Sequence, residues 1–332
     1  MSGSSPSSAQ PAAARHVHAS RTGLVFDHAY RRHDPGPCHP ESPDRYMAMS
    51  EAFRKNGVLN SAVRIAPRLG SEDDVHLAHT RAYWKLVQHD VDRKASRLST
   101  GDTSIGEHTL ETALLAVGGV LSAVDAVFEK KVANAFVVVR PPGHHATASR
   151  GMGFCVFNSV AIAARYAEKV YGVDRTLIVD WDVHHGNGTQ EIFYRDPEVL
   201  FFSTHQWPWY PGTGAVDECG EGAGLGYTIN CPLPAGAGHA DVLGAFRKRL
   251  MPAALSFKPA LVLISAGFDS RRGDPLGRFA LKDSDFAEMT SLLMEIAEAS
   301  AGGRVVSVLE GGYNLTGLAS ASLAHFEALR GA

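Results

Sequence analysis

Runs of β-branched and other apolar residues alternate with helical patterns over most of the chain, and this alternation constrains the fold more than any other feature. Several runs are apolar throughout, which is typical of central strands in a parallel sheet that is covered on both faces. The alternation from about residue 135 onward predicts a single-domain α/β fold with a central, mostly parallel sheet and helices on both faces. The predicted strands are 23–26, 136–139, 177–179, 200–203, 261–265 and 305–309.

Helical patterns connect the predicted strands. The stretch 104–130 begins with Ser104 three residues before Glu107, which is the spacing of a capping box. Another helix is predicted between Asn158, a good N-cap, and Gly172. Two further helical patterns lie at 283–300 and 315–329.

The beginning of the chain differs in composition from the rest. Residues 1–20 are rich in Ser, Ala and Pro and lack the apolar core of a secretory signal. We therefore expect a disordered tail there. No linker follows this tail, so residues 21–332 are expected to form one domain.

Composition argues against several classes of protein. The net charge of -3 gives no sign of a surface that binds nucleic acid, and no apolar run looks long enough to span a membrane. The four cysteines are far apart, as in reduced intracellular proteins. We therefore expect a cytoplasmic protein without direct contact to nucleic acid or membrane. The sequence leaves a homo-oligomer open.

Polar segments that contain glycine directly follow four of the predicted strands. In open α/β sheets, ligands bind outside the carboxyl ends of the strands. We therefore expect these four segments to converge on one cleft. They comprise residues 140–146, 180–188, 266–275 and 310–314.

Acidic and imidazole side chains at two of these strand ends have the pattern of a metal site. If the strand continues through 180–184, alternation places Asp180, Asp182 and His184 on one face. Asp182 and His184 can then bind one cation, and Asp269 can supply a third ligand. Three protein ligands with a free fourth position are typical of catalytic zinc, although the same set also suits Fe(II) or Co(II). The alternative interpretation is a set of hydrogen-bonded strand-end caps.

Two adjacent histidines and one tyrosine are candidates for moving protons and stabilising charge. His144 and His145 follow a Pro-Pro-Gly stretch that restricts its own backbone. An imidazole beside a carboxylate is suited to proton transfer, and Asp180 is the expected partner of one of them. A surface turn is the alternative. Tyr313 follows two glycines, which allow a tight turn, and its phenol can donate a hydrogen bond to an oxyanion.

Together these segments resemble the zinc-dependent histone deacetylase family, in its class II-like form and that of the bacterial histone deacetylase-like amidohydrolases. The resemblance covers nearly all of the chain after the tail, and it implies an arginase-like α/β fold with the active site at the carboxyl ends of the strands. The matching segments are HPESPDR (39–45), GDTSIG (101–106), RPPGHHA (140–146), GFCVFN (153–158), DWDVHHGNGT (180–189), STHQWPWYPGTG (203–214), SAGFDSRRGDPLG (265–277) and LEGGYN (309–314).

The resemblance implies roles for the candidate residues. His144 and His145 become the general base and acid pair, and Tyr313 assists as an electrophile. One zinc ion per chain is implied, with the ligands Asp182, His184 and Asp269. A structural potassium ion is implied as well, bound around Asp180, Asp182, His184, Ser203 and Thr204.

A narrow tunnel for the stem of an acyl-lysine is also implied. Phe154 and Tyr210 would form its walls. Gly153 would lie beside it, where only a residue without a side chain leaves room. Arg45 would line an internal pocket near the acetate product, and Leu276 would stand at the rim.

Two positions separate subgroups of the family. Asn187 stands where class I enzymes have an aspartate as the partner of the second histidine, so His145 is expected to be a weaker base here. Leu276 stands where polyamine-selective class II relatives have a glutamate gatekeeper. A cationic polyamine would therefore find one fewer counter-charge at the rim.

The expected function is hydrolysis of an acetylated lysine side chain or a small acetylated amine to acetate and free amine. One alternative is an acetylpolyamine or other small-amide hydrolase with the same chemistry. A two-manganese ureohydrolase needs a further carboxylate two residues after Asp269, where this chain has Arg271. A non-catalytic acyl-lysine binder is the third alternative, although every catalytic position that can be matched is filled.

Overall fold

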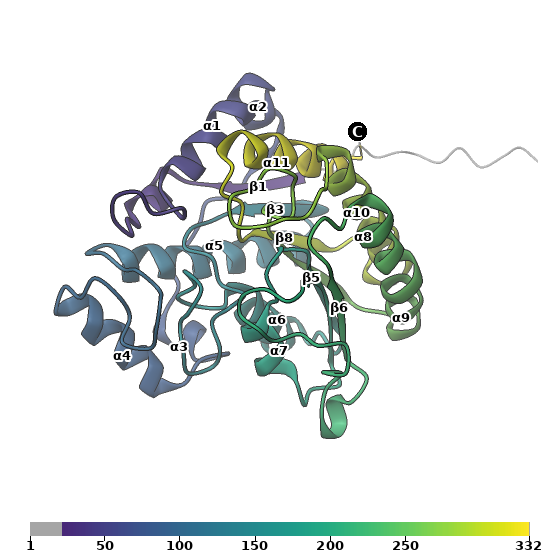
Figure 1. The fold of residues 1–332 in the computed structure, drawn as a ribbon, viewed down its shortest axis with the longest axis horizontal. Coiled ribbons are helices and arrows are strands. Elements are labelled where there is room, and N and C mark those ends of the chain that lie inside the picture. The colour runs from purple at the N-terminus through teal and green to yellow at the C-terminus, as the bar shows by residue number, and fades with distance from the viewer. Residues whose placement is uncertain (1–21, 332) are drawn as a thin grey trace, which may run out of the picture.

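A computed structural model describes residues 22–331, so the tail predicted at 1–20 lies outside the described residues. The described chain forms an open, eight-stranded sheet in the order β2-β1-β3-β8-β7-β4-β5-β6 (Figure 1). Every neighbouring pair of strands is parallel, which agrees with the predicted sheet. The strands are β1 (Thr22–Phe26), β2 (Val63–Arg64), β3 (Asn134–Val138), β4 (Thr176–Asp180), β5 (Val199–Gln206), β6 (Thr228–Leu233), β7 (Leu261–Ala266) and β8 (Val305–Leu309).

The sequence patterns miss the two strands at the edges of the sheet. β2 has only two residues, and neither is buried. β6 contains Pro232 and is buried along only part of its length. Proline cannot donate to the hydrogen-bond ladder and is therefore confined to edge strands, bulges and strand starts. A short or interrupted edge strand carries a weak pattern, which explains both omissions.

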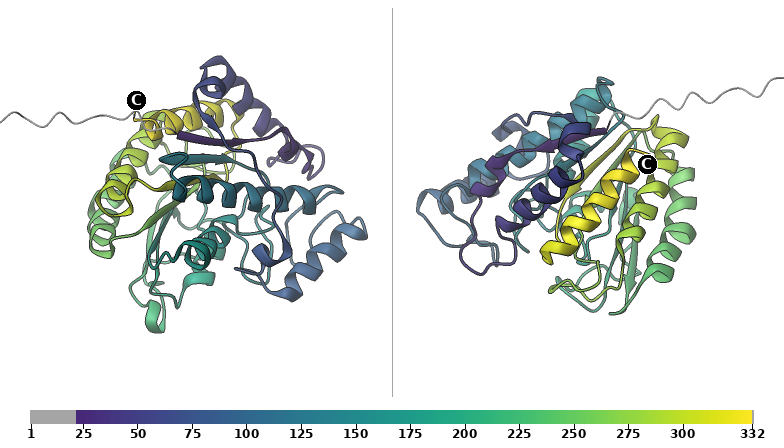
Figure 2. Two further views of the ribbon diagram at one scale, coloured as in Figure 1. Left: turned by 180° about the vertical axis from the view of Figure 1, so that it is seen from behind. Right: turned by 90° about the horizontal axis from the view of Figure 1, so that it is seen from above.

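Helices cover both faces of the sheet (Figure 2). On one side α5 and α6 pack against each other, and on the other α11 packs against α1 and α10. The helices are α1 (Asp44–Lys55), α2 (Val58–Ser61), α3 (Glu72–Val75), α4 (Arg81–Asp92), α5 (Thr109–Phe128), α6 (Ser159–Tyr171), α7 (Asn187–Phe193), α8 (His239–Ala245), α9 (Met251–Phe257), α10 (Asp283–Ile296) and α11 (Leu315–Leu329).

Both predicted ends of α6 agree with the structure. The side chain of Asn158 accepts a hydrogen bond of 3.0 Å from the backbone N–H of Ala161. The helix ends at Gly172, whose φ of +68° lies in the left-handed region that glycine adopts without strain. α6 therefore follows directly from the loop that contains the predicted tunnel residues.

The capping box predicted for α5 is wrong, because the helix begins only at Thr109. Ser104 instead forms an antiparallel bridge with Arg97. The expectation that no apolar run is long enough to span a membrane also needs correction. α5 has 20 residues with a mean hydropathy of 1.7, but 67% of this stretch is buried inside the protein. This burial is typical of a core helix.

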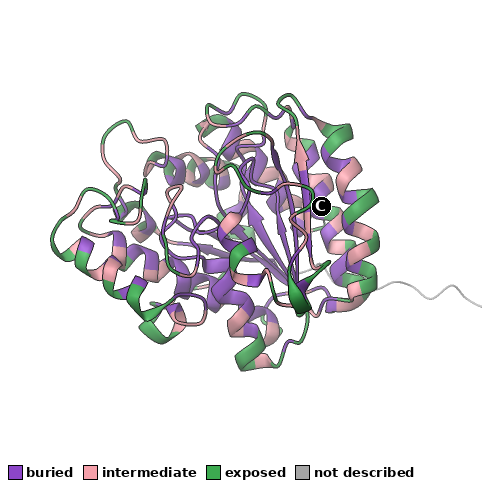
Figure 3. Cartoon of the chain, turned by 60° about the horizontal axis from the view of Figure 1, so that its bottom comes forward, coloured by how far each residue is buried: buried purple, intermediate pink, exposed green. Residues whose placement is uncertain are grey.

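The centre of the sheet is buried along its whole length (Figure 3). In β3, β4, β5, β7 and β8 every residue is buried. Polar functional groups can therefore reach solvent or a ligand only where these strands end, which places the candidate site at the edge of the sheet.

Candidate active site

The four polar segments predicted to converge lie together at one edge of the sheet. They follow β3, β8, β7 and β4, which are consecutive in the sheet, and parallel strands have all their carboxyl ends on the same edge. A cavity of about 260 Å³ opens between these segments. It is lined by His145 from the first segment, Tyr313 from the second and His184 from the fourth.

Asp182, His184 and Asp269 form a buried cluster whose ligand atoms all lie within 4.8 Å of one another. Nδ1 of His184 is 3.0 Å from Oδ1 of Asp182 and 3.3 Å from Oδ2 of Asp269. This Oδ2 atom is buried and accepts no hydrogen bond from the described residues. A buried carboxylate oxygen without a donor needs a cation or proton beside it. The donor set therefore fits zinc, which takes carboxylate and imidazole ligands.

The loop geometry differs from the prediction that Asp182 and His184 alternate along a strand. β4 ends at Asp180, so both residues lie in the loop that follows. Oδ1 of Asp180 accepts the N–H of Asp182 at 3.1 Å, and Oδ1 of Asp182 accepts the N–H of His184 at 2.9 Å. The N–H of Val183 donates to Oδ1 of Asp269 at 2.8 Å. The carboxylates of the cluster therefore also hold the backbone that carries them.

The electrostatics of the cluster favour a positive charge. Burial and the neighbouring Asp182 carboxylate raise the pKa of Asp269 to about 7. Burial alone would lower the pKa of His184, but its hydrogen bond to Asp182 and the nearby negative charge of Asp269 raise that pKa to about 10. Two crowded carboxylates thus share the charge of one imidazolium, and a divalent cation would relieve their repulsion.

His144 and His145 have partners of different charge. Nδ1 of His144 lies 2.9 Å from Oδ2 of Asp180, and Nδ1 of His145 lies 2.8 Å from Oδ1 of Asn187. Burial lowers the pKa of both imidazoles. For His144 the carboxylates of Asp180 and Asp182 outweigh burial and raise its pKa well above the ordinary value. For His145 burial and the charges of His144 and His184 lower the pKa well below it.

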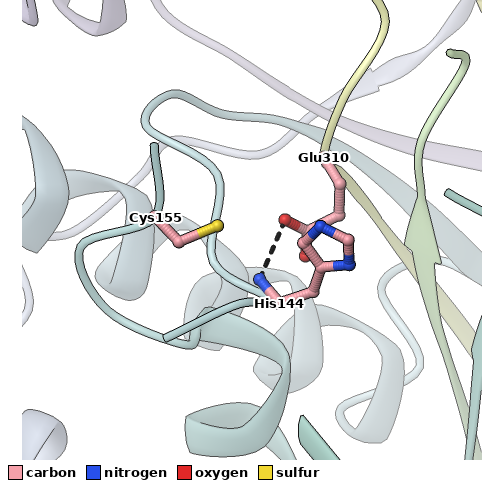
Figure 4. A group of neighbouring side chains, drawn as sticks. All are labelled: His144, Cys155 and Glu310. Carbon is pink, nitrogen blue, oxygen red and sulfur yellow. Dashed lines mark hydrogen bonds between the residues drawn. The ribbon is translucent and has the colours of Figure 1, made fainter. Parts of the chain in front are cut away.

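His144, Cys155 and Glu310 form a second group with metal-ligand spacing (Figure 4). Glu310 Oε2 accepts the N–H groups of Gly143 and His144 at 2.7 and 3.1 Å, and the Ser265 hydroxyl donates to Oε1 at 3.2 Å. Burial raises the pKa of the Cys155 thiol, which disfavours the thiolate that a metal requires. This group therefore anchors the backbone of the histidine loop rather than forming a second metal site.

Arg45 on α1 holds the loop that carries Tyr313. Its Nε donates to the carbonyl of Gly312 at 2.7 Å, and its Nη2 donates to the carbonyl of Glu310 at 2.5 Å. The guanidinium carbon lies 5.1 Å from the centre of the Tyr313 ring. Arg45 is completely buried, so its charge reaches the site without screening by solvent.

The sequence patterns miss the carboxylate that neutralises this buried arginine. Glu41 forms salt bridges of 2.9 Å with Arg45 and 2.6 Å with Arg140, and it lies 3.3 Å from His33. Although burial raises the pKa of Glu41, these cationic partners hold it well below its usual range. Glu41 lies in the segment 39–45, which is part of the resemblance. The only sequence feature that could have indicated Glu41 is its acidic side chain within that segment.

Aromatic residues form the walls of the cavity, as the resemblance implies. Phe154 packs edge-on against Tyr313 with ring centres 5.9 Å apart, and Tyr210 packs edge-on against His145 at 5.2 Å. Gly153 has a φ of +57°, and a Cβ atom there would collide with the ring of His145. The nine residues that line the cavity are Asp102, His145, Gly153, Phe154, His184, Trp209, Tyr210, Leu276 and Tyr313.

Asp102 is a second residue of the site for which the sequence patterns gave no role. Its Oδ1 accepts the N–H of Gly153 at 2.8 Å, and its Oδ2 accepts the hydroxyl of Tyr210 at 2.9 Å. It lies in the matched segment 101–106, but its partners are distant in the chain. Asp102 therefore ties together two walls of the cavity.

The residues expected around a potassium ion lie on neighbouring elements. Asp180 and Ser203 are partners in the register between β4 and β5, and Thr204 follows in β5. Asp182 and His184 belong to the loop after β4, and all five residues are buried. Asp180, Ser203 and Thr204 therefore lie on two adjacent strands, next to the loop that carries Asp182 and His184.

Comparison with known proteins agrees with this architecture. The protein family defined by the histone deacetylase domain matches residues 39–329 of this chain. The chain is also similar to the crystal structure of the HD domain of HDA15, with a TM-score of 0.89 and 38% sequence identity. The superposition covers 94% of this chain and 89% of that chain. The shared architecture supports the implied arginase-like fold.

Three curated relatives are each 42% identical to this chain. The probable deacetylase of Archaeoglobus fulgidus aligns over 89% of this chain and 82% of its own length. The human polyamine deacetylase HDAC10 aligns over 92% of this chain, and histone deacetylase 6 of Caenorhabditis elegans over 88%. The chain spans only 45% and 32% of these two longer proteins. By its sequence and its fold, the chain belongs to the histone deacetylase family.

Proposed function

We propose that this chain is a zinc-dependent deacetylase that hydrolyses the N-acetyl amide of a lysine side chain to acetate and a free amine. One observation carries the proposal. His184, which forms the buried cluster with Asp182 and Asp269, lines the same cavity as His145 and Tyr313. This combination supplies a metal site, a base and an oxyanion donor to one amide bond, which is what hydrolysis requires.

Zinc suits the cluster because two carboxylates and an imidazole leave a fourth coordination position free. A bound zinc ion would polarise the acetamide carbonyl and lower the pKa of a coordinated water to about 7. The chain itself contributes the rigid donor set, because each carboxylate also accepts backbone N–H groups.

His145 is the group suited to accept the proton of the attacking water. The amide nitrogen of Asn187 faces the sulfur of Met152 at 3.5 Å, so its Oδ1 accepts the hydrogen on Nδ1 of His145. Nε2 of His145 is then the unprotonated nitrogen. Its lowered pKa keeps this imidazole neutral near pH 7. The same Nε2 can later return the proton to the leaving amine.

Tyr313 is the second donor to the amide oxygen as negative charge develops on it. Burial raises the pKa of its phenol well above the ordinary value, although Arg45 opposes this effect. The hydroxyl therefore stays protonated and can donate a hydrogen bond throughout the reaction. The aromatic side chains of Phe154, Trp209 and Tyr210 in the lining suit the apolar stem of a lysine side chain.

A potassium ion bound around Asp180 and Ser203 is a further part of the proposal. Asp180 and Ser203 are buried partners in the register between β4 and β5, and oxygen atoms are typical ligands of hard cations. Such an ion would fix the end of β4 from which the zinc ligands project. Its loss should lower thermal stability as well as activity, which titration with potassium chloride against a choline salt would reveal.

A second candidate substrate is an acetylated polyamine, because the human relative HDAC10 is named a polyamine deacetylase. The uncharged Leu276 at the rim argues against this substrate, because a carboxylate at that position would attract a cationic polyamine. The test is to measure acetate release from acetyl-lysine peptides and from acetylputrescine with the zinc-loaded protein. We expect a higher kcat/KM for the peptides. The reverse order would establish the polyamine instead, and no release from either would contradict the proposed hydrolysis.

The ureohydrolase alternative finds no support in the residues after Asp269. Arg271 occupies the position where a second metal would need a carboxylate, and its guanidinium forms a 2.5 Å salt bridge with Asp283. Metal analysis should therefore give one divalent ion per chain. Two ions per chain would favour the ureohydrolase.

A further inference from the structure

The carboxylate of Asp274 connects the loop that carries Tyr313 to the rim of the cavity. Its Oδ2 accepts the backbone N–H of Tyr313 at 2.7 Å and that of Asn314 at 3.0 Å. Its Oδ1 accepts the N–H of Leu276 at 2.9 Å. Only 8% of Asp274 is exposed, so these bonds are largely shielded from water. Hydrogen bonds to a charged acceptor in such a site are stronger than neutral ones.

Tyr313 needs such a support because two glycines precede it. Gly312 has a φ of +120°, a conformation that glycine adopts because it has no Cβ, and neither glycine has a side chain that could fix the turn by packing. The other side-chain hydrogen bonds to this loop involve the residues before Tyr313. Arg45 binds the carbonyls of Glu310 and Gly312, and Asp182 accepts the N–H of Gly311. Asp274 is thus the residue that holds the peptide N–H of Tyr313 itself.

The two loops are joined a second time next to Asp274. The side-chain amide of Asn314 donates to the carbonyl of Gly273 at 2.9 Å, and its Oδ1 caps α11 by accepting the N–H of Gly317. The start of α11 and the segment 273–276 therefore form one hydrogen-bonded unit. Tyr313 lies at the point where this unit faces the cavity.

We propose that Asp274 is a positioning residue that directs the Tyr313 hydroxyl toward the reacting amide. This inference rests on the proposed function, because it assigns Asp274 an effect on catalysis only through Tyr313. A misplaced donor loses most of its value, and displacement by about 1 Å can cost roughly 100-fold in rate. Replacement of Asp274 should therefore reduce kcat while leaving the zinc ligands in place.

Two substitutions separate the geometric role of Asp274 from its charge. D274A removes both acceptor oxygens, and with them all three hydrogen bonds, and should lower kcat by about 10- to 100-fold, with KM within about twofold of the parent value. D274N can keep a carbonyl oxygen toward Tyr313 and Asn314 while its NH₂ group faces Leu276. It should therefore retain kcat within about fivefold of the parent. If D274N were as slow as D274A, the proposed geometric role would be wrong.

Asp285 provides a matched control. It is also a buried carboxylate, 5% exposed, and it accepts the backbone N–H of Lys282 at 2.8 Å at the start of α10. D285A should lower the unfolding temperature without changing kcat. A parallel loss of kcat in D285A and D274A would mean that the effect of Asp274 is one of general stability, which would overturn the proposal.

A double-mutant cycle distinguishes a positioning role from any other effect. In the Y313F background the hydroxyl is absent, so adding D274A should reduce kcat by less than about twofold. Hydrogen–deuterium exchange of a peptide covering 310–318 should be faster in D274A than in the parent, with or without zinc. If D274A slowed Y313F as much as it slows the parent, or if exchange were unchanged, Asp274 would not act through Tyr313.

The same cycle separates this inference from the proposed function. If Y313F alone kept the parental kcat, the oxyanion role of Tyr313 would fail, and the inference would fail with it. If Y313F were slow and D274A were as fast as the parent, only the role of Asp274 would be refuted.

Discussion

His145 and Asn187 are joined by a hydrogen bond of 2.8 Å between Nδ1 and Oδ1, so the imidazole proposed as the base has a neutral partner. The adjacent His144 instead has the carboxylate of Asp180 as its partner. Burial lowers the pKa of both imidazoles, but the carboxylates of Asp180 and Asp182 outweigh burial at His144, whereas no such partner does so at His145. Two neighbouring histidines can therefore hold different protonation states at one pH.

The first prediction concerns the pH dependence of activity in N187D. The base must be neutral, so activity is lost when pH falls through the pKa of His145. Because that pKa is lowered in the parent, the acidic limb of the pH profile of kcat/KM should have its midpoint below the ordinary imidazole pKa of about 6.5. A carboxylate at 187 favours the imidazolium and should move the limb of kcat/KM upward by about one pH unit or more. N60D adds the same charge at an exposed position and should leave the limb unmoved. An unchanged limb in N187D would rule out His145 as the titrating base.

The second prediction concerns the Tyr313 hydroxyl. Y313F should lower kcat by about 100- to 1000-fold, which is the usual loss of one oxyanion donor, while KM stays similar. Its zinc content and unfolding temperature should match the parent, because the ring and its contact with Phe154 are kept. Steady-state kinetics with metal analysis would test this. A kcat equal to that of the parent would show that Tyr313 has no oxyanion role.

The third prediction concerns Gly153. In G153A the added Cβ would collide with the ring of His145, and the residue would also have to adopt a φ of +57°. We expect the activity to fall at least about tenfold, because displacement of a catalytic group by about 1 Å can cost far more. G172A is the control, since Gly172 has a φ of +68° with no atom within 4 Å of the added Cβ. It should cost about 1–2 kcal/mol of stability and leave kcat unchanged. Equal activity of the two variants would show that the space beside His145 is not needed.

The fourth prediction concerns substrate choice at the rim. L276E adds a carboxylate to the lining of the cavity and should raise kcat/KM for acetylputrescine relative to an acetyl-lysine peptide. A partly exposed ion pair is worth at most about 1 kcal/mol, so the expected change in this ratio is about fivefold or less. L276Q has the same shape without the charge and should leave the ratio unchanged. An equal ratio in all three proteins would show that position 276 does not select for charge.

Much of the fold follows from local patterns. The central strands contain continuous apolar runs, so their positions and their parallel arrangement are readable in the sequence. The capping box at Ser104 misled the prediction of α5, because that residue forms an antiparallel bridge with Arg97 in the segment before the helix. Whether a capping motif is used depends on contacts outside the motif itself.

In the candidate site, too, local patterns predict some residues and miss others. Asp182, His184 and Asp269 stand out because charged groups directly after buried strands are costly. The ties of Glu41 to Arg140 and of Asp102 to Tyr210 join residues about a hundred positions apart, and no local pattern signals such pairs. The cytoplasmic location and a homo-oligomer stay predictions from the sequence.

The metal dependence of hydrolysis tests the central claim most directly. The measurement is acetate release after chelation and after addition of one equivalent of zinc, with bound metal counted in the same samples. We predict that the parent loses activity with the chelator and regains it at one zinc per chain. D269N should bind zinc more weakly and stay inactive at that stoichiometry. Full activity in the metal-free protein, or in D269N without bound metal, would contradict the account.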